Sequence, residues 1–108
     1  MTYSAWDVVT VPFPFTDKKT IKKRPALVLN KSEYQTKTGH LILLMITSAA
    51  NSNWYSDVNI EDLAASGLKS DSVVRFKIFS LDERLIIKKI GALSTIDIQK
   101  VKKNLSNS

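Results

Sequence analysis

An almost continuous apolar run in the middle of the chain is the feature that most restricts its fold. The run is His40-Leu-Ile-Leu-Leu-Met-Ile-Thr47. It is far shorter than the roughly 20 apolar residues that a membrane helix needs. Strands that are buried on both faces of a sheet lack the alternation of half-exposed strands, and this run has that property. It therefore predicts a central core strand that is covered on both sides.

Shorter segments rich in β-branched and aromatic residues surround this run, with turn-forming residues between them. Residues 6–11 predict a first strand that ends at Pro12, because proline cannot continue a central strand. The polar residues 31–39 predict a connecting segment. Further strands are predicted at residues 25–29, 57–60, 72–80 and 85–90, with one helical turn at residues 61–65 that ends at Gly67.

The last part of the chain has the pattern of an amphipathic helix. Ser94 is a suitable N-cap, and apolar residues follow at helical spacing on one side. These are Ile96, Ile98, Val101 and Leu105. Together the segments predict a mainly β fold of the α+β type: a small, partly closed β-barrel of five to six strands with a C-terminal helix.

Length and cysteine content limit the possible functions. With 108 residues, the chain has room for one domain, residues 1–108, and one modest core. The absence of cysteine excludes a disulfide framework, a zinc site of thiolates and a cysteine nucleophile. We expect a cytoplasmic protein without a signal peptide or a membrane segment.

Positive charge is concentrated in one short stretch. The formal net charge is +6 and the pI is about 9.7, which favours a polyanionic partner. A solvated, solubilising loop is the alternative interpretation of the same charges. The cluster consists of Lys18, Lys19, Lys22, Lys23 and Arg24.

The residue types that are present also limit the chemistry. No set of His, Asp and Glu has the spacing of metal ligands, and no glycine-rich phosphate loop exists, so we expect neither a metal nor a cofactor. The single imidazole, His40, begins the buried strand, and we expect a structural or solvent-facing role for it. RNA supplies its own nucleophile in the 2′-hydroxyl, so a ribonuclease can work mainly by positioning a phosphate and stabilising its charge.

Several blocks of the sequence, in the same order, resemble the MazF/PemK family of toxins. The resemblance covers nearly the whole chain. It implies an SH3-like barrel, a homodimer, and a sequence-selective endoribonuclease that leaves a 2′,3′-cyclic phosphate and a 5′-hydroxyl. It also implies neutralisation by an antitoxin. The blocks are residues 7–16, 23–29 and 46–48, Asp71-Ser-Val-Val with Lys77, and Leu81-Asp82.

The resemblance implies that Arg24 and Thr47 are the catalytic pair. A guanidinium is planar and always charged, so Arg24 can grip two phosphate oxygens and spread the charge of the transition state. Thr47 ends the core strand, where its hydroxyl can reach the scissile phosphate or the 2′-oxygen from a rigid support. Ser48 is the nearest substitute. The simpler alternatives are that Thr47 is a β-forming residue at the end of a strand and that Arg24 is one more solvated cation.

Further RNA contacts are expected from cations and aromatic rings. Phe15 is a candidate for stacking on a base, although its alternation with Phe13 also suits core packing; Trp54 and Tyr55 are further candidates. The expected partners are single-stranded messenger RNA and an acidic antitoxin, whose extended segment suits a basic groove with apolar walls. The cations are Lys18, Lys19, Lys22 and Lys23 for phosphates and Lys77 for a phosphate or a base.

The chain also departs from the family pattern. Trp6 stands where a glycine is common, and the first loop is lysine-rich. The sequence leaves two other functions as alternatives. A catalytically silent nucleic-acid-binding module needs only the basic residues. A gyrase poison like CcdB shares the fold but acts through a C-terminal tryptophan, and the tryptophans here are Trp6 and Trp54.

Overall fold

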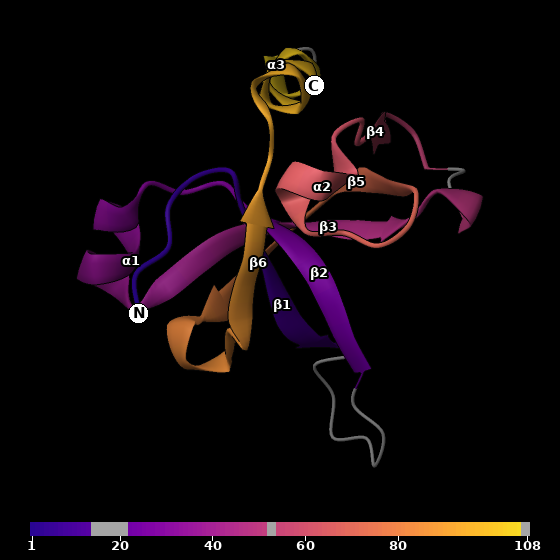
Figure 1. Cartoon of the computed structure of the whole chain (residues 1–108). Helices are drawn as coiled ribbons and strands as arrows, with labels where there is room; N and C mark the ends of the chain where they lie inside the picture. Colours follow the sequence, from indigo (N-terminus) through magenta and orange to yellow (C-terminus); the bar gives the residue numbers. More distant parts are fainter. Residues whose placement is uncertain (14–21, 52–53, 107–108) are drawn as a thin grey trace.

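One six-stranded antiparallel sheet dominates the computed structural model, which describes residues 1–13, 22–51 and 54–106. The strands have the order β4-β5-β3-β2-β1-β6, and the sheet curls into a half-barrel (Figure 1). The predicted fold class, a mainly β, barrel-like sheet with a C-terminal helix, is confirmed. The strands are β1 (Asp7–Phe13), β2 (Lys22–Val28), β3 (His40–Ser48), β4 (Val58–Asn59), β5 (Ser72–Asp82) and β6 (Lys88–Ala92).

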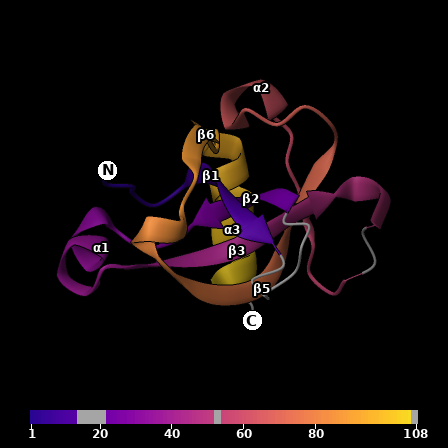
Figure 2. The ribbon, with the colours of Figure 1, turned by 90° about the horizontal axis from the view of Figure 1, so that it is seen from below.

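Short helices connect the strands, and a longer helix closes the chain. The helix α3 lies across one face of the sheet (Figure 2). Within the described part of the chain, no helix is long and apolar enough to cross a membrane. The helical segments are α1 (Ser32–Thr38), η1 (Ala49–Asn51), α2 (Leu63–Ser66), η2 (Glu83–Leu85) and α3 (Thr95–Ser106).

The apolar run forms β3, the predicted core strand. β3 lies between β2 and β5, and its alternate side chains enter two separate apolar clusters. Leu41 and Leu43 belong to one cluster, whereas Leu44 and Ile46 belong to the other, which α3 covers. All four side chains are almost fully buried. The prediction of a strand covered on both faces is therefore confirmed.

The predicted limits of three strands were wrong by a few residues. β1 runs through Pro12 to Phe13, because β6 pairs only with residues 7–10 and leaves one side of β1 open, where a missing N–H is tolerated. β2 begins at Lys22 instead of Pro25, since the register with β1 extends to the pair Phe13 and Lys22. β6 begins at Lys88 instead of Leu85, because Leu85 belongs to η2 and the pairing of β6 with β1 starts at Lys88.

The polar segment 31–39 is mostly helix, which its sequence did not predict. The helix α1 presents a single buried residue, Gln35, so it lacks the apolar period of an ordinary surface helix. The Gln35 amide accepts a hydrogen bond from Tyr3 N (2.8 Å) and donates to Met1 O (2.9 Å) and Glu83 Oε1 (2.9 Å). These contacts with distant parts of the chain hold α1 in place.

The sequence of β5 predicts an alternation, with Val73, Arg75 and Lys77 on one face and Val74, Phe76 and Ile78 on the other, and the structure interrupts it. The register with β3 shifts between Leu44 and Met45, where Phe76 and Lys77 have no opposite partner. Such a bulge rotates the following side chains with respect to the sheet. Ile78 directly follows this irregularity and is 63% exposed, although the alternation places it on the apolar face with Val74 and Phe76.

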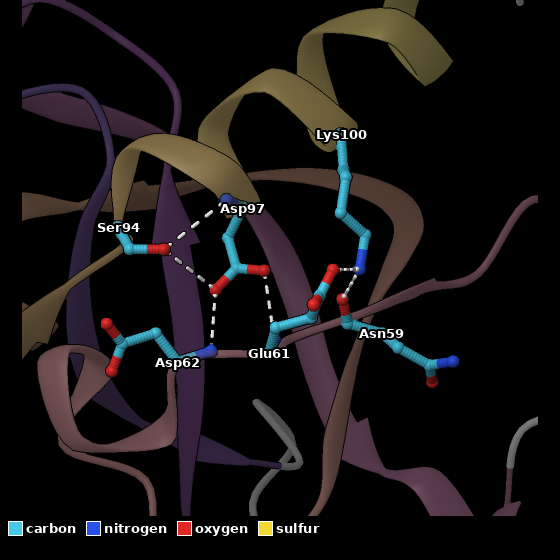
Figure 3. Close-up of polar contacts among 6 residues, drawn as sticks. All are labelled: Asn59, Glu61, Asp62, Ser94, Asp97 and Lys100. Atoms are coloured by element: carbon cyan, nitrogen blue, oxygen red, sulfur yellow. Dashed lines mark hydrogen bonds and ion pairs between the residues drawn. The ribbon is translucent and has the colours of Figure 1, made fainter.

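A buried carboxylate joins α3 to the segment before α2. Asp97 Oδ1 accepts a hydrogen bond from Glu61 N (2.9 Å), and its Oδ2 accepts from Asp62 N (3.0 Å) and Ser94 Oγ (3.2 Å) (Figure 3). Ser94 Oγ in turn accepts from Asp97 N (3.3 Å), so the predicted N-cap is confirmed. Lys100 Nζ donates to Asn59 O (2.6 Å) nearby.

The apolar side of α3 differs from the prediction at one position. Ile98, Val101 and Leu105 pack on the core, whereas Ile96 is 55% exposed. Ile96 lies in the first turn of the helix, beside the segment of Ser94 and Asp97 that carries the polar connection. The first turn is therefore attached by hydrogen bonds, and the later turns are attached by apolar packing.

Two glycines bring α2 against β6. A Cβ atom at Gly67 would overlap the backbone carbonyl of Ile90, and one at Gly91 would overlap the backbone of Ser66. Gly67 also ends α2 with a φ of 75°, in the left-handed region that favours glycine. This close approach places the chain from Gly67 to Ser70 beside β6, where it forms one wall of the cavity described below.

Trp6 has a backbone conformation that suits glycine. Its φ is 76°, in the left-handed region. Both backbone groups of Trp6 form hydrogen bonds: Trp6 N donates to Val28 O (2.7 Å), and Trp6 O accepts from Leu93 N (2.9 Å). The indole packs against the core under α3, and Lys102 Nζ lies 5.8 Å from the ring centroid. Packing of the ring offsets the backbone strain.

We expect Trp6→Gly to be more stable than Trp6→Ala by about 1 kcal/mol, because only alanine keeps the left-handed strain after the ring is lost. Urea unfolding of both variants measures the difference. Ile98, which packs on the same core from α3, provides the control. There the alanine variant should be the more stable, since glycine costs about 1 kcal/mol within a helix. The same order at both positions would contradict the argument.

Candidate active site

A cavity of about 470 Å³ opens where β2 and β3 stop pairing. The last paired positions are Ala26 and Met45, and the next residue of β2 is Pro25, which has no N–H to continue the ladder. Extended by two positions, the same register places Arg24 opposite Thr47. The first residues of β2 and the last residues of β3 diverge there, as Figure 1 shows.

Five segments that are distant in the sequence build the cavity. β1 contributes Thr10, which is paired with Lys88 of β6 on one side and with Pro25 of β2 on the other. The segment after α2 closes the cavity through its approach to β6. The described lining residues are Thr10, Lys23, Arg24, Pro25, Ile46, Thr47, Ser48, Gly67, Leu68, Lys69, Ser70, Ser72, Lys88 and Ile90.

The lining carries positive charge without compensation from described carboxylates. It contains Lys23, Arg24, Lys69 and Lys88, and none of the described lining residues is acidic. No described carboxylate forms an ion pair with any of these four cations. Such a cavity attracts anions, because the electric fields of several cations in one recess add up.

The three arginines of the chain differ in whether they form an ion pair with a described carboxylate. Arg75 NH2 lies 3.1 Å from Asp57 Oδ2, in a largely buried ion pair, and Arg84 NH2 lies 2.8 Å from Asp82 Oδ2. Arg24 is exposed at the cavity and forms no ion pair with a described carboxylate. Arg24 is therefore the arginine whose guanidinium is available to an anionic ligand.

Hydroxyl groups line the same cavity. Thr47 is half-buried near the end of β3, and its hydroxyl makes no hydrogen bond with the described residues. Ser48 is exposed, and its Oγ accepts a weak hydrogen bond from Ala50 N (3.3 Å). Because β3 is anchored by buried side chains on both faces, it holds Thr47 on a rigid support. A hydroxyl and a guanidinium that line one cavity without a partner among the described residues suit the binding of a phosphate group.

The structure places the predicted site residues in three groups. Arg24, Thr47, Ser48 and Lys23 line one cavity. Lys22 lies one residue before Lys23, at the start of β2. It is exposed and does not line the cavity. Lys77 lies elsewhere on β5, with its Nζ 4.4 Å from the centroid of the Trp54 ring. The predictions for Lys18, Lys19 and Phe15 fall outside the described residues.

Lys69 and Lys88 are cavity residues that the sequence did not indicate. Lys69 follows the short helix α2, and Lys88 is the first of two adjacent lysines in β6. The second, Lys89, forms an ion pair with Asp7 (3.2 Å) and is not in the lining. Nothing local distinguishes Lys88 from Lys89, because the distinction depends on strand pairing and on the approach of α2.

His40 lies far from the cavity. It begins β3, seven residues before Thr47, which corresponds to roughly 23 Å at about 3.3 Å per residue. Its side chain is exposed, and its Nδ1 lies 3.0 Å from Thr38 O. Its partner position on β5 is Asp82, whose pKa is held well below its ordinary value by hydrogen bonds from the side chain and backbone of Arg84.

A model of one protein family matches almost the entire chain. The family is described as a PemK-like, MazF-like toxin of type II toxin–antitoxin systems, and the match extends over residues 4–108. The chain belongs to the PemK/MazF-like toxin family. The resemblance noted in the sequence is thereby confirmed. Among curated proteins, no significant match was found.

Solved structures of MazF proteins share the fold. MazF in the MazE–MazF complex of Deinococcus radiodurans is 23% identical, with a TM-score of 0.78 over 99% of this chain and 95% of that chain. Toxin MazF-mt6 of Mycobacterium tuberculosis is 18% identical, with a TM-score of 0.74 over 94% and 93%. A mycobacterial endoribonuclease in complex with its cognate antitoxin is 12% identical, with a TM-score of 0.73 over 98% and 91%.

Proposed function

We propose that this PemK/MazF-like toxin is a sequence-selective endoribonuclease that cuts single-stranded RNA without a metal ion. The observation that carries the proposal is the cavity that Arg24 and Thr47 line together, where neither the guanidinium nor the hydroxyl has a partner in the described part of the chain. The titles of related structures, which name an endoribonuclease, add support. Single-stranded RNA suits the site, because its phosphates and unstacked bases are accessible to side chains.

In the proposed reaction the RNA supplies the nucleophile. The 2′-oxygen attacks the adjacent phosphorus and forms a new P–O bond, while the bond from phosphorus to the 5′-oxygen of the next nucleotide breaks. The 2′-hydroxyl loses its proton to solvent, and the 5′-oxygen gains a proton from Arg24, which solvent then reprotonates. The products are a 2′,3′-cyclic phosphate and a 5′-hydroxyl, so the step needs neither a water nucleophile nor a metal ion.

Arg24 and Thr47 have different roles in this proposal. Arg24 binds the non-bridging phosphate oxygens and stabilises the extra negative charge of the five-coordinate transition state, and it is the proposed proton donor to the 5′-oxygen. Thr47 hydrogen-bonds the scissile phosphate or the 2′-oxygen and so aligns the attack. Lys23 and Ser48 hold the neighbouring backbone, and Lys18, Lys19, Lys22, Lys77 and Phe15 are proposed as outer RNA contacts.

The proposed partners follow from charge and from related structures. Several of these structures contain a toxin with its antitoxin, as in the MazE–MazF complexes. We propose that an acidic antitoxin covers the basic cavity of this chain in the cytoplasm, and that two copies of the toxin form a homodimer that offers a longer RNA groove. Sedimentation of the purified toxin as a monomer at micromolar concentration would contradict the dimer.

The function is tested with a long, largely unstructured RNA and purified protein in the presence of EDTA. We expect discrete cuts at a short recurring sequence, with 2′,3′-cyclic phosphate and 5′-hydroxyl ends. Primer extension locates the cuts, and enzymatic end labelling identifies the end groups. The same RNA with 2′-O-methyl groups should remain intact, because its nucleophile is blocked.

Two other results would lead to different conclusions. RNA that stays intact but is bound would support the catalytically silent binding module. Cleavage that stops in EDTA and returns with a divalent cation would contradict a mechanism that depends on Arg24 and the 2′-hydroxyl alone.

A further inference from the structure

The cavity has cations on two sides. Lys23 and Arg24 enter from β2, next to Thr47. Lys69 enters from the segment after α2, and Lys88 enters from β6, on the far side of β1. Neighbouring strands lie about 4.8 Å apart, so β6 is roughly 10 Å from β2 across β1. Cations that enter from two sides of the cavity can bind successive phosphates of one RNA backbone.

We propose that Lys69 and Lys88 form a second phosphate subsite, which holds a backbone phosphate next to the scissile one. The proposal rests on the endoribonuclease function, and it gives the two lysines a positioning role in it. By fixing the neighbouring phosphate, they hold the RNA backbone in the cavity so that a phosphodiester lies at Arg24 and Thr47. The ligand of this subsite is a phosphate of single-stranded RNA, not a base.

The surroundings of both lysines support a built subsite. Lys88 is opposite Thr10 in the β1–β6 register, and Thr10 Oγ1 donates a long hydrogen bond to Lys88 O (3.5 Å). The Gly67–Ile90 and Gly91–Ser66 backbone contacts keep the segment of Lys69 against β6. Neither lysine has an ion-pair partner among the described carboxylates, so both charges are available.

The neighbouring Lys89 shows what a structural lysine in this strand does. It carries the same charge one residue further along β6, but its Nζ lies 3.2 Å from Asp7 Oδ1. Lys89 is absent from the cavity lining, in contrast to Lys88. Lys88→Ala and Lys89→Ala therefore change the net charge equally and differ in whether they remove a cation from the cavity.

The first experiment measures binding without cleavage. A 2′-O-methyl RNA of the sequence used for the cleavage assay is titrated with each variant between about 50 and 200 mM salt. Lys88→Ala and Lys69→Ala should each lower the slope of log affinity against log salt by about 0.7, as expected for the loss of one single-strand phosphate contact. Lys89→Ala should keep the native slope. The arginine variants Lys88→Arg and Lys69→Arg should restore it.

The second experiment measures cleavage by the same variants. The alanine variants of Lys69 and Lys88 should raise KM by roughly threefold to tenfold at constant salt, while kcat at saturating RNA stays within about twofold. A native slope in Lys88→Ala and Lys69→Ala, or an equal change in Lys89→Ala, would overturn the subsite. If the native protein binds the RNA but cuts none, the proposed endoribonuclease function is wrong. The slopes of log affinity against log salt still show whether Lys69 and Lys88 contact phosphates.

Discussion

Replacing Arg24 by alanine is expected to lower kcat for RNA cleavage by about 10²–10³-fold, with a much smaller change in KM. Arg24 lines the cavity and has no ion-pair partner among the described residues, unlike Arg75 and Arg84. Its charge can therefore act on the phosphate. Its contribution should be largest in the transition state, where the phosphate carries the most charge. Removing one such group typically costs about 3–4 kcal/mol of transition-state stabilisation. Single-turnover cleavage in EDTA measures the effect.

Two further variants show whether the effect depends on the position of the positive charge and on the planar shape of the guanidinium. Arg84→Ala removes the same charge from an exposed arginine near the His40 end of β3, and it should cleave like the native protein. Arg24→Lys keeps the charge but cannot grip two oxygens at once, so it should recover only part of the rate. A thermal unfolding curve confirms that each variant is folded. Native kcat in Arg24→Ala would exclude Arg24 from the chemistry.

Replacing Asp97 by alanine is expected to destabilise the protein by about 2–5 kcal/mol. Its carboxylate is 1% exposed and accepts hydrogen bonds from Glu61 N, Asp62 N and Ser94 Oγ (Figure 3). Alanine would leave two backbone N–H groups without this acceptor, and each unsatisfied buried donor costs about 1–3 kcal/mol. It would also remove a negative charge from the first turn of α3, where the helix dipole favours one.

Urea unfolding measures this loss, and thermal unfolding should show a decrease in Tm of roughly 10–20 °C. Glu61→Ala is the control, because it removes another carboxylate of the same region. Glu61 is exposed and pairs with Lys100 Nζ (3.0 Å) at the surface, and such pairs contribute at most about 1 kcal/mol. Equal destabilisation by both variants would show that the Asp97 hydrogen bonds do not join α3 to the rest of the fold.

The elements that could be predicted from the sequence are those with a strong local pattern. β3 has a long apolar run, α3 has a cap and a helical period, and Gly67 ends α2 as expected. The sequence does not predict the helix α1, because its only buried side chain is the polar Gln35, which forms hydrogen bonds with residues that are far away in the sequence. A helix held by such contacts has no local signature.

Site prediction had the same limit. The family resemblance predicts Arg24 and Thr47 as the catalytic pair, and the structure brings them to one cavity with Lys23 and Ser48. Their catalytic roles stay predictions. Lys77 is predicted as an RNA contact too, but it is not in the cavity lining and its Nζ lies over the Trp54 ring.

The sequence alone thus determined the fold class, the family, the core strand and the basic character of the protein, because these depend on residue types and on short-range periodicity. The tertiary structure decided which cations share a cavity. Lys88 and Lys89 are neighbours with identical side chains, yet one lines the cavity and the other binds Asp7. That difference arises from the register of β1 with β6 and from the close approach of α2, both of which join residues far apart in the chain.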